Sequence, residues 1–325
     1  MVTKIYTRSN KIFTLNGQWL KKSNSLIEDY AIFNGRVNGD NTGYTGPTGY
    51  YLIRLNDNAI RYLLPPWGDI RPGYIYNSGQ VRGNSLFVPN FMDTDGYWYS
   101  NDLGNSWSKV QIGNNGSSEP LSVRVSQDEK YILYIDRTTG LWVSSDHGNS
   151  FINKITDEDF YDSGINYDGT YMVAGSRYGG FYVSMDHGQS WELKYSGDVR
   201  GCVIMYKNNR AFFIDGDNGD VYEYDFSTDN YIVINSSILG AATQIFTAAY
   251  DTYFAAGDRN GHFLTYDGTF YSHDLQSLLP SDVNIGTYVS YDGRIISSGG
   301  NDETAISFDY GQTWEIFDPV NFNTF

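Results

Sequence analysis

One eight-residue pattern recurs four times along the chain, and this repeat decides the fold. Its copies are Ser100-Asn-Asp-Leu-Gly-Asn-Ser-Trp107, Ser144-Ser-Asp-His-Gly-Asn-Ser-Phe151, Ser184-Met-Asp-His-Gly-Gln-Ser-Trp191 and Ser307-Phe-Asp-Tyr-Gly-Gln-Thr-Trp314. The shared positions are Ser100, Asp102, Gly104, Ser106, Trp107; Ser144, Asp146, Gly148, Ser150, Phe151; Ser184, Asp186, Gly188, Ser190, Trp191; Ser307, Asp309, Gly311, Thr313 and Trp314. An Asp two residues before a Gly is typical of a tight turn, because the carboxylate accepts hydrogen bonds from the turn's amides and Gly adopts a positive φ.

Weaker copies extend this repeat over most of the chain. Aspartates at 57, 225 and 267 fall into one series with those at 102, 146, 186 and 309. The intervals between the seven positions are 45, 44, 40, 39, 42 and 42 residues. A regular period near 40 residues is typical of β-propeller blades, each of which is one small sheet.

The residues between two copies also match a blade. Short apolar or β-branched runs at 121–126, 130–135, 140–144 and 151–155 are separated by Gly, Asp or Asn, which predicts strands joined by turns. The third run of a period is apolar at consecutive positions, as at Tyr97, Trp98 and Tyr99, which indicates a sheet covered on both faces. We therefore predict an all-β propeller of four-stranded blades, with the repeat turn between the third and fourth strands.

The whole chain, residues 1–325, is expected to form this single domain. Seven blades fit the seven positions, and residues 1–24 would then supply strands that close the ring. Eight blades is the alternative, if Thr14-Leu-Asn-Gly-Gln-Trp19 marks a further repeat. Residues 36–48 and 64–80 are rich in Gly, Pro and Asn and are predicted to be long loops inside the first two repeats.

The four copies resemble the Asp box, or bacterial neuraminidase repeat, at every defined position. The resemblance implies a structural β-hairpin turn at the rim, away from the usual substrate sites of this sialidase-like superfamily. Its closing aromatic residue would pack between neighbouring blades. The superfamily contains enzymes and binding proteins alike, so the box itself does not decide the function.

The sequence lacks the catalytic signature that a sialidase resemblance would require. That signature comprises three arginines around the substrate carboxylate, a Tyr–Glu nucleophile pair, an Asp acid/base and an Arg-Ile-Pro string. The nearest strings, at 51–55 and 70–72, do not match. A xyloglucanase resemblance would imply two propellers, whereas this chain has room for one. We predict no catalytic residues, with a glycoside hydrolase of either type as the alternative.

Charge and composition restrict the partners. The chain carries 22 Lys and Arg against 38 Asp and Glu, a formal net charge of −16, which disfavours binding to nucleic acid or anionic lipid. No run approaches the roughly 20 apolar residues of a membrane span, and the N-terminus lacks a Sec-type signal. We expect no nucleic acid partner and no membrane insertion. The single cysteine, Cys202, lies in an apolar run and is expected to be a small buried residue.

Two further features are candidate binding sites. Asp215, Asp217 and Asp220 place three carboxylates within six residues, as calcium loops do, although a tight hairpin turn uses the same residue types. Apart from this calcium site, no cofactor is expected. Trp67, in a Pro-rich stretch, is the best candidate for an exposed binding aromatic, with local packing under the prolines as the other interpretation.

These observations favour a non-catalytic binding or assembly module. The resemblance implies a protein that works outside the cytoplasm, yet no export signal is visible. A component of a virus or phage particle satisfies both conditions, because it is made in the host cytoplasm and ends on a particle. Its expected partners are proteins of the assembly and cell-surface glycans, since Tyr-rich surfaces favour stacking and hydrogen bonding. A cytoplasmic protein-interaction scaffold is the remaining alternative.

Overall fold

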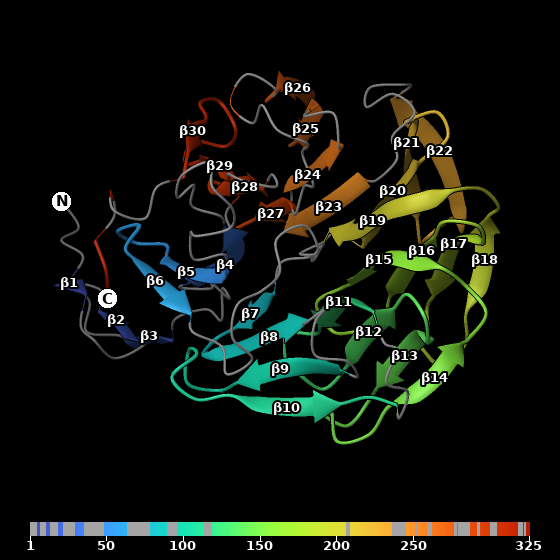
Figure 1. Cartoon of the computed structure of the whole chain (residues 1–325), viewed down its shortest axis with the longest axis horizontal. Coiled ribbons are helices and arrows are strands. Elements are labelled where there is room, and N and C mark those ends of the chain that lie inside the picture. The colour runs from blue at the N-terminus through green and yellow to red at the C-terminus, as the bar shows by residue number, and fades with distance from the viewer. Residues whose placement is uncertain are drawn as a thin grey trace, which may run out of the picture.

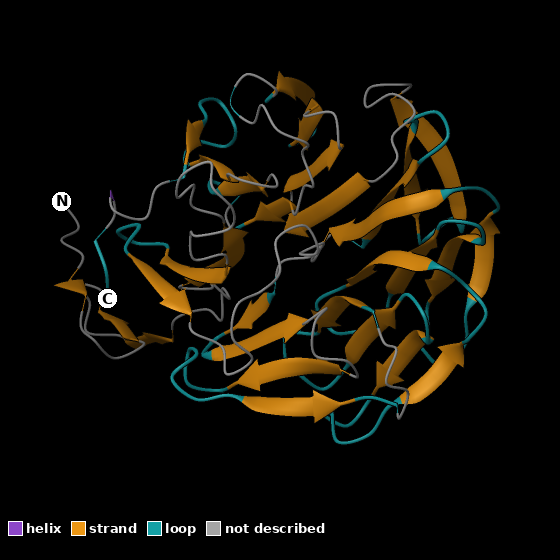
Figure 2. Cartoon of the chain, viewed as in Figure 1, coloured by secondary structure: helices purple, strands orange, loops and turns teal. Residues whose placement is uncertain are grey.

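In the described part of the chain, thirty short strands account for nearly all of the regular structure. The computed structural model describes residues 5–6, 11–13, 19–21, 30–35, 49–63, 79–89, 96–113, 119–205, 209–235, 245–250, 253–258, 262–275, 278, 287–290, 293–299, 304–317, 321 and 323–325. Figure 2 shows strands joined by loops throughout these residues. None of them belongs to a helix that is long and apolar enough to cross a membrane.

Seven antiparallel sheets follow one another around a ring, as Figure 1 shows. The first contains β4 (Tyr30–Gly35), β5 (Gly49–Arg54) and β6 (Ile60–Leu63). The next three contain β7 (Gln80–Arg82), β8 (Ser85–Pro89), β9 (Gly96–Ser100) and β10 (Ser108–Gln111); β11 (Pro120–Val125), β12 (Ile132–Asp136), β13 (Gly140–Ser144) and β14 (Ile152–Ile155); and β15 (Phe160–Ile165), β16 (Met172–Ser176), β17 (Gly180–Ser184) and β18 (Glu192–Tyr195).

The last three blades also have four strands each. They contain β19 (Val199–Met205), β20 (Arg210–Asp215), β21 (Val221–Asp225) and β22 (Asn230–Asn235); β23 (Ile245–Tyr250), β24 (Tyr253–Asp258), β25 (His262–Tyr266) and β26 (Phe270–Asp274); and β27 (Thr287–Val289), β28 (Ile296–Gly299), β29 (Thr304–Ser307) and β30 (Glu315–Ile316). The prediction of a seven-bladed all-β propeller is confirmed.

The carboxyl end of the chain contacts the first blade. Ile60 donates its amide to the carbonyl of Asn323 at 2.7 Å and forms a parallel bridge with Thr324. The ring of Phe325 lies 5.7 Å from Tyr30 and packs under the guanidinium of Arg54. Residues 323–325 therefore extend the sheet of the first blade beyond β6.

The amino-terminal strands β1 (Ile5–Tyr6), β2 (Lys11–Phe13) and β3 (Trp19–Lys21) pair with one another in a separate three-stranded sheet. The ring-closing role that we expected for residues 1–24 stays a prediction. The expected loops at 36–48 and 64–80 lie outside the described residues, except that Gly79 precedes β7 and Gln80 begins it.

Seven hydrophobic clusters hold the ring together, and each lies between two neighbouring blades. The cluster that joins the last blade to the first includes Phe33, Tyr51, Ile306 and Phe317, all of them buried. Phe317 meets Phe33 edge-on at 5.0 Å between ring centroids. Because each inner sheet is covered on both faces, its strands are apolar at consecutive positions instead of alternating.

The repeat turns lie between the third and fourth strands, as the sequence predicts. Asp102 follows β9, Asp225 ends β21 and Asp267 follows β25, so all three lie where the third strand leads into the fourth.

Asp57 lies in the turn between β5 and β6. Arg294, in the turn between β27 and β28, donates to the carbonyl of Leu55 and to Asn58, both at 2.9 Å. Arg61 donates to Asn105 at 3.2 Å, so this turn lies on the same side of the ring as the other turns of the series. The carboxylate of Asp57 accepts hydrogen bonds from Arg54 at 2.7 Å and from the amide of Ala59 at 3.2 Å.

Candidate functional site

Strand direction divides the functional residues between two faces of the ring. The first strand of each blade begins on one face, which we call the front face, and the turns between second and third strands lie on that same face. The turns between first and second strands, and the repeat turns, lie on the opposite back face. All twenty residues of the predicted repeat turns therefore belong to the back face.

Each repeat turn is closed by its own side chains. In the first, Asp102 accepts hydrogen bonds from the hydroxyl of Ser106 at 2.6 Å, the amide of Ser106 at 2.9 Å and the hydroxyl of Ser100 at 2.8 Å. The hydroxyl oxygen of Ser100 accepts the amide of Gly104 at 2.7 Å. These donors, the Ser106 hydroxyl foremost, lower the pKa of Asp102 to about 2. The same bonds recur around Asp146, Asp186 and Asp309, so these carboxylates serve the turn.

The residue before the turn's glycine shares the glycine's unusual backbone. Leu103, His147, His187 and Tyr310 have φ from 56° to 63°, and the following glycines have φ from 75° to 84°. Sequence reasoning predicted this geometry only for the glycines. Since a non-glycine residue in this region is strained, the turn must be held by the surrounding hydrogen bonds.

The closing aromatics pack between blades. Trp107, Phe151, Trp191 and Trp314 each contact the hydrophobic cluster between their own blade and the preceding one. The indole Nε1 atoms of Trp191 and Trp314 also donate to carbonyls within their own turns, at 3.3 and 3.0 Å. These contacts are structural and leave the front face as the surface on which to look for function.

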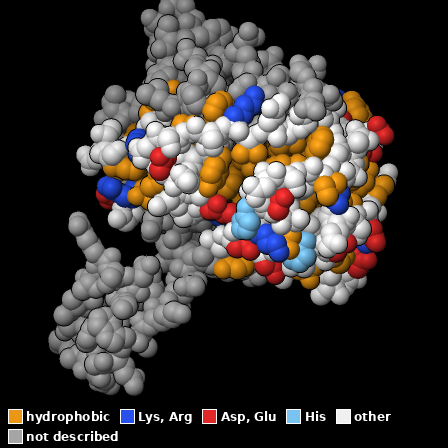
Figure 3. All heavy atoms as spheres, turned by 90° about the horizontal axis from the view of Figure 1, so that it is seen from below, with side chains coloured by type: hydrophobic (Ala, Val, Ile, Leu, Met, Phe, Trp, Pro, Cys, Tyr) orange, Lys and Arg blue, Asp and Glu red, His pale blue; other side chains and the backbone are white. Residues whose placement is uncertain are grey.

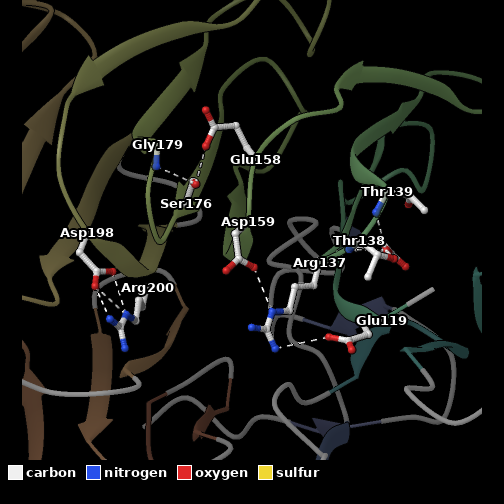
Figure 4. Close-up of polar contacts among 11 residues, drawn as sticks. Glu119, Arg137, Thr138, Thr139, Glu158, Asp159, Ser176, Gly179, Asp198 and Arg200 are labelled. Atoms are coloured by element: carbon white, nitrogen blue, oxygen red, sulfur yellow. Dashed lines mark hydrogen bonds and ion pairs between the residues drawn. The ribbon is translucent and has the colours of Figure 1, made fainter. Parts of the chain in front are cut away.

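Three consecutive blades place an acidic residue at the start of their first strand on the front face (Figure 4). Glu119, Asp159 and Asp198 directly precede β11, β15 and β19, respectively. Their carbonyls accept the amides of Arg137, Arg177 and Gly216, at 3.0, 2.9 and 2.7 Å. The backbone thus ties the start of each first strand to the turn between second and third strands of the same blade.

Arg137 joins two of these blades. Its guanidinium lies 3.0 Å from the carboxylate of Asp159 and 3.4 Å from that of Glu119, as Figure 4 shows. Burial opposes the charge of Arg137, but the nearby Tyr161 and Asp159 hold its pKa above the ordinary value. With 37% of its side chain exposed, Arg137 is paired yet still accessible to a partner.

An exposed tyrosine stands beside these ion pairs. Tyr178, in the turn between β16 and β17, is 74% exposed, and the guanidinium of Arg177 lies 4.8 Å from its ring centroid. On the next blade, Arg200 forms a doubly hydrogen-bonded pair with Asp198, with Nε 2.8 Å from one carboxylate oxygen. The front face of these blades therefore presents paired charges around one prominent aromatic ring.

The predicted calcium loop lies on this face and is occupied by its own hydrogen bonds. One oxygen of Asp215 accepts the Tyr195 hydroxyl at 2.5 Å, and the other accepts the amide of Asp217 at 2.8 Å. The amide of Asp220 donates to Asn218 at 2.8 Å. Within the described ranges, no three His, Cys, Asp or Glu side chains converge on a metal-sized site. Calcium binding stays a prediction, and the geometry is that of a hairpin turn.

A polar network connects the innermost strands, and sequence reasoning missed it. Arg124 of β11 contacts the carboxylate of Asp162 of β15 at 3.1 Å and donates Nε to the carbonyl of Ser163 at 3.0 Å. Arg82 of β7 donates to the carbonyl of Val125 at 2.7 Å. These bonds link the second, third and fourth blades near the ring axis. Their partners are about 40 residues apart and share no motif, so no local signal pointed to them.

A second turn repeat was also missed, although the sequence carries it. The sequence Asn166-Tyr-Asp-Gly169 recurs as Ser290-Tyr-Asp-Gly293, and Asn166 and Ser290 both lie directly after the first strand of their blades. Asn166 and Ser290 accept an amide five residues later, at 2.9 Å in both blades. The two turn repeats of a blade lie on the back face and support one another, as where His187 donates its amide to Thr170 at 3.1 Å.

The remaining candidate residues are placed as follows. Trp67 lies outside the described residues. Cys202 is fully buried, as expected, and burial raises the pKa of its thiol. His147 and His187 lie on separate back-face turns, and His187 stacks on Tyr131 of the preceding blade at 4.4 Å.

Comparisons with known proteins establish the fold and not a family. No protein-family model matches the chain, and no curated protein matches it in sequence. Among solved structures, it is similar to the GH74 enzyme of Niastella koreensis (TM-score 0.60, 11% identity), covering 89% of this chain and 54% of that one. It is also similar to YCF48 bound to D1 peptide (TM-score 0.55, 15% identity; 88% and 96% covered) and to a propeller in the nidogen/laminin complex (0.53, 11%; 73% and 94%). The chain therefore spans about half the length of the GH74 enzyme.

Proposed function

We propose that this protein is a non-catalytic propeller that binds a protein partner through its front face. The observation that carries the proposal is Tyr178, which is 74% exposed beside Arg177, on the same face as the ion pairs of Arg137 and Arg200. Tyrosine and arginine are the residues that most often dominate the energy of protein interfaces. Two of the similar propellers are described in complex with a peptide or protein, which supports the same use here.

The charge of the front face indicates the chemistry of that partner. The carboxylates of Glu119, Asp159 and Asp198 surround the two paired arginines, in a chain of net charge −16. A partner segment with basic and apolar side chains would complement this face. A binding site for an acidic ligand would need arginines that are not already paired with carboxylates.

We propose further that the repeat turns are Asp boxes and that the sialidase signature is lacking. The hydrogen bonds around Asp102 and its three counterparts support the first part. For the second, Arg124, Arg137 and Arg200, in the described part of the chain, each contact a carboxylate. Such arginines are poorly suited to clamp the carboxylate of a substrate.

The proposed setting is a virus or phage particle, with assembly proteins and cell-surface glycans as partners. It rests on the composition and on the fold, which suits a binding module; a cytoplasmic scaffold is the alternative setting. Mass spectrometry of purified particles and of cytoplasm tests it. Recovery at a fixed ratio to other particle proteins is expected, and recovery only as a free cytoplasmic protein would favour the scaffold.

A substitution tests the front face itself. Tyr178→Ala should reduce incorporation into particles, because it removes the exposed ring at the centre of the proposed contact. Tyr271→Ala is the matched control, since Tyr271 is also exposed (48%) but lies on an outer strand. Equal incorporation of both variants would contradict the proposal.

One observation favours a glycosidase as the second candidate. The hydroxyl of Tyr182 donates to Glu158 at 2.8 Å, which is a Tyr–Glu pair of the kind that a sialidase uses. Burial, reinforced by Glu158, raises the pKa of Tyr182, which opposes formation of a phenolate nucleophile. Hydrolysis of sialosides or xyloglucan oligosaccharides that Tyr182→Phe abolishes would establish this candidate in place of the binding module.

A further inference from the structure

The outermost strand of the fifth blade differs from the other outer strands. β22 reads Asn-Tyr-Ile-Val-Ile-Asn and carries no charged residue, and it is also the longest outer strand among the described blades, with six residues. Every other described fourth strand carries a charged or histidine side chain: Lys109 in β10, Lys154 in β14, Glu192 and Lys194 in β18, His273 and Asp274 in β26, and Glu315 in β30. Charges on an edge strand normally prevent pairing with another sheet.

The position of β22 leaves its edge available. Within the described ranges it pairs with β21 alone, at the end of its sheet and on the periphery of the ring in Figure 1. Ile232 is 59% exposed and Val233 is 49% exposed. Tyr231 and Ile234 pack against the clusters on either side of the blade, which holds the strand in place. A fixed, extended and uncharged edge is a preorganised template for another strand.

The residues of β22 suit antiparallel pairing with β22 of a second copy of the chain. In a two-fold dimer of edge strands, a residue near the centre faces its own copy. An axis at Ile232 sets Ile232 against the partner's Ile232 and Tyr231 against the partner's Val233. An axis one residue later sets Val233 against the partner's Val233 and Ile232 against the partner's Ile234. Both registers match β-branched and aromatic side chains, which are favourable cross-strand pairs, and neither opposes like charges.

We propose that β22 is a dimerisation edge, and that its occupant is β22 of a second copy of this chain. The two blades would then form one continuous eight-stranded sheet with a two-fold axis. This contact lies on the rim and leaves the front faces of both copies free, so it does not depend on the proposed function. Since each copy carries a net charge of −16, raised salt should strengthen the association by screening the repulsion.

The rim of the third blade provides a matched control. Figure 3 views the side of the ring on which hydrophobic side chains form a band bordered by charged ones. Ile152 of β14 is 60% exposed. Its position is equivalent to that of Ile232, because each lies three residues before the last residue of its strand that pairs with the third strand, Ile155 and Asn235 respectively. The strand of Ile152, however, carries Lys154. Ile152→Lys therefore adds the same charge to an outer strand that is already protected.

Sedimentation velocity over a wide range of protein concentration tests the proposal. The wild type should shift from monomer to dimer as concentration rises, and more readily in raised salt. Ile232→Lys should weaken the association by more than about tenfold, because two-fold symmetry introduces the charge twice at the contact. Ile152→Lys should associate like the wild type. Circular dichroism and thermal unfolding check that both variants remain folded.

Two results would overturn the proposal. One is a wild type that stays monomeric at every concentration and salt level. The other is association that Ile232→Lys leaves intact, or that Ile152→Lys weakens to the same degree, because the contact would then lie elsewhere on the molecule.

Discussion

Replacement of Arg124 by methionine should destabilise the ring far more than any surface substitution. Arg124 lies 3.1 Å from the carboxylate of Asp162, and their side chains are 12% and 1% exposed. At an effective dielectric constant of about 20, that separation corresponds to a gross attraction of about 5 kcal/mol. Methionine fills similar volume but leaves the buried carboxylate without its cationic partner, which typically costs about 3–5 kcal/mol. It also removes the hydrogen bond to the carbonyl of Ser163.

The double variant Arg124→Met/Asp162→Asn separates the stranded charge from the lost packing. Because it removes both charges, it should cost only about 1–2 kcal/mol, so the coupling between the two positions should be about 2–3 kcal/mol plus the cost of Asp162→Asn alone. Arg137→Met is the control: Arg137 also contacts carboxylates but is 37% exposed, so its loss should cost less than about 1 kcal/mol.

Urea unfolding monitored by tryptophan fluorescence measures these differences through the free energy of unfolding. The reasoning is refuted if Arg124→Met costs no more than Arg137→Met. It is equally refuted if the double variant is destabilised by the sum of its single variants, since the two residues would then act independently.

Other predictions concern the turns and the core. Hydrogen bonds in the native turn lower the pKa of Asp102 to about 2 from an ordinary value of 3.8. They therefore stabilise the fold fully above about pH 3.8, and this stabilisation is lost as the pH falls through about 2. The melting temperature of Asp102→Asn should accordingly fall less between about pH 4 and about pH 2 than that of the wild type. Gly180 has a φ of 112°, and an added Cβ would lie 1.9 Å from the carbonyl oxygen of Tyr195, so Gly180→Ala should cost more than about 3 kcal/mol in urea unfolding. Gly268→Ala, with a φ of 109° and nothing within 4 Å of the added Cβ, should cost only the backbone strain of about 1–2 kcal/mol, and equal losses in the two variants would contradict the clash. Cys202 is buried and its thiol pKa is raised, so Ellman's reagent should react with it in urea but not in the native protein; rapid native labelling would show that the fifth blade opens.

The blade architecture could be predicted because the repeat turn is a local structure. Its Ser, Asp and Gly form hydrogen bonds within seven residues, so the same residues recur wherever the turn recurs. Asp57 shows the limit of this reasoning, because it matches the period of about 42 residues but not the pattern of the turn. Arg54 and the amide of Ala59 bind its carboxylate, in place of the hydroxyls that bind Asp102 and its three counterparts.

The front face and the axial network could not be predicted in the same way. Arg137 meets Asp159 from another blade, and Arg124 meets Asp162, 38 residues away, on a neighbouring strand. Such pairs depend on how the blades lie against one another, which local patterns do not encode. The Asn166-Tyr-Asp-Gly169 turn is different, because its second copy at 290–293 was visible in the sequence and would have fixed the turn between first and second strands.

The most direct test of the account is photo-crosslinking from the front face in assembled particles. A photoreactive phenylalanine analogue replaces Tyr178 in one variant and Tyr271, on an outer strand, in the other. The account predicts a crosslink from position 178 to one defined protein partner, with its contact peptide identified by mass spectrometry, and no crosslink to that partner from position 271. Crosslinks to the same partner from position 271 alone, or none from position 178 in intact particles, would contradict binding through the front face.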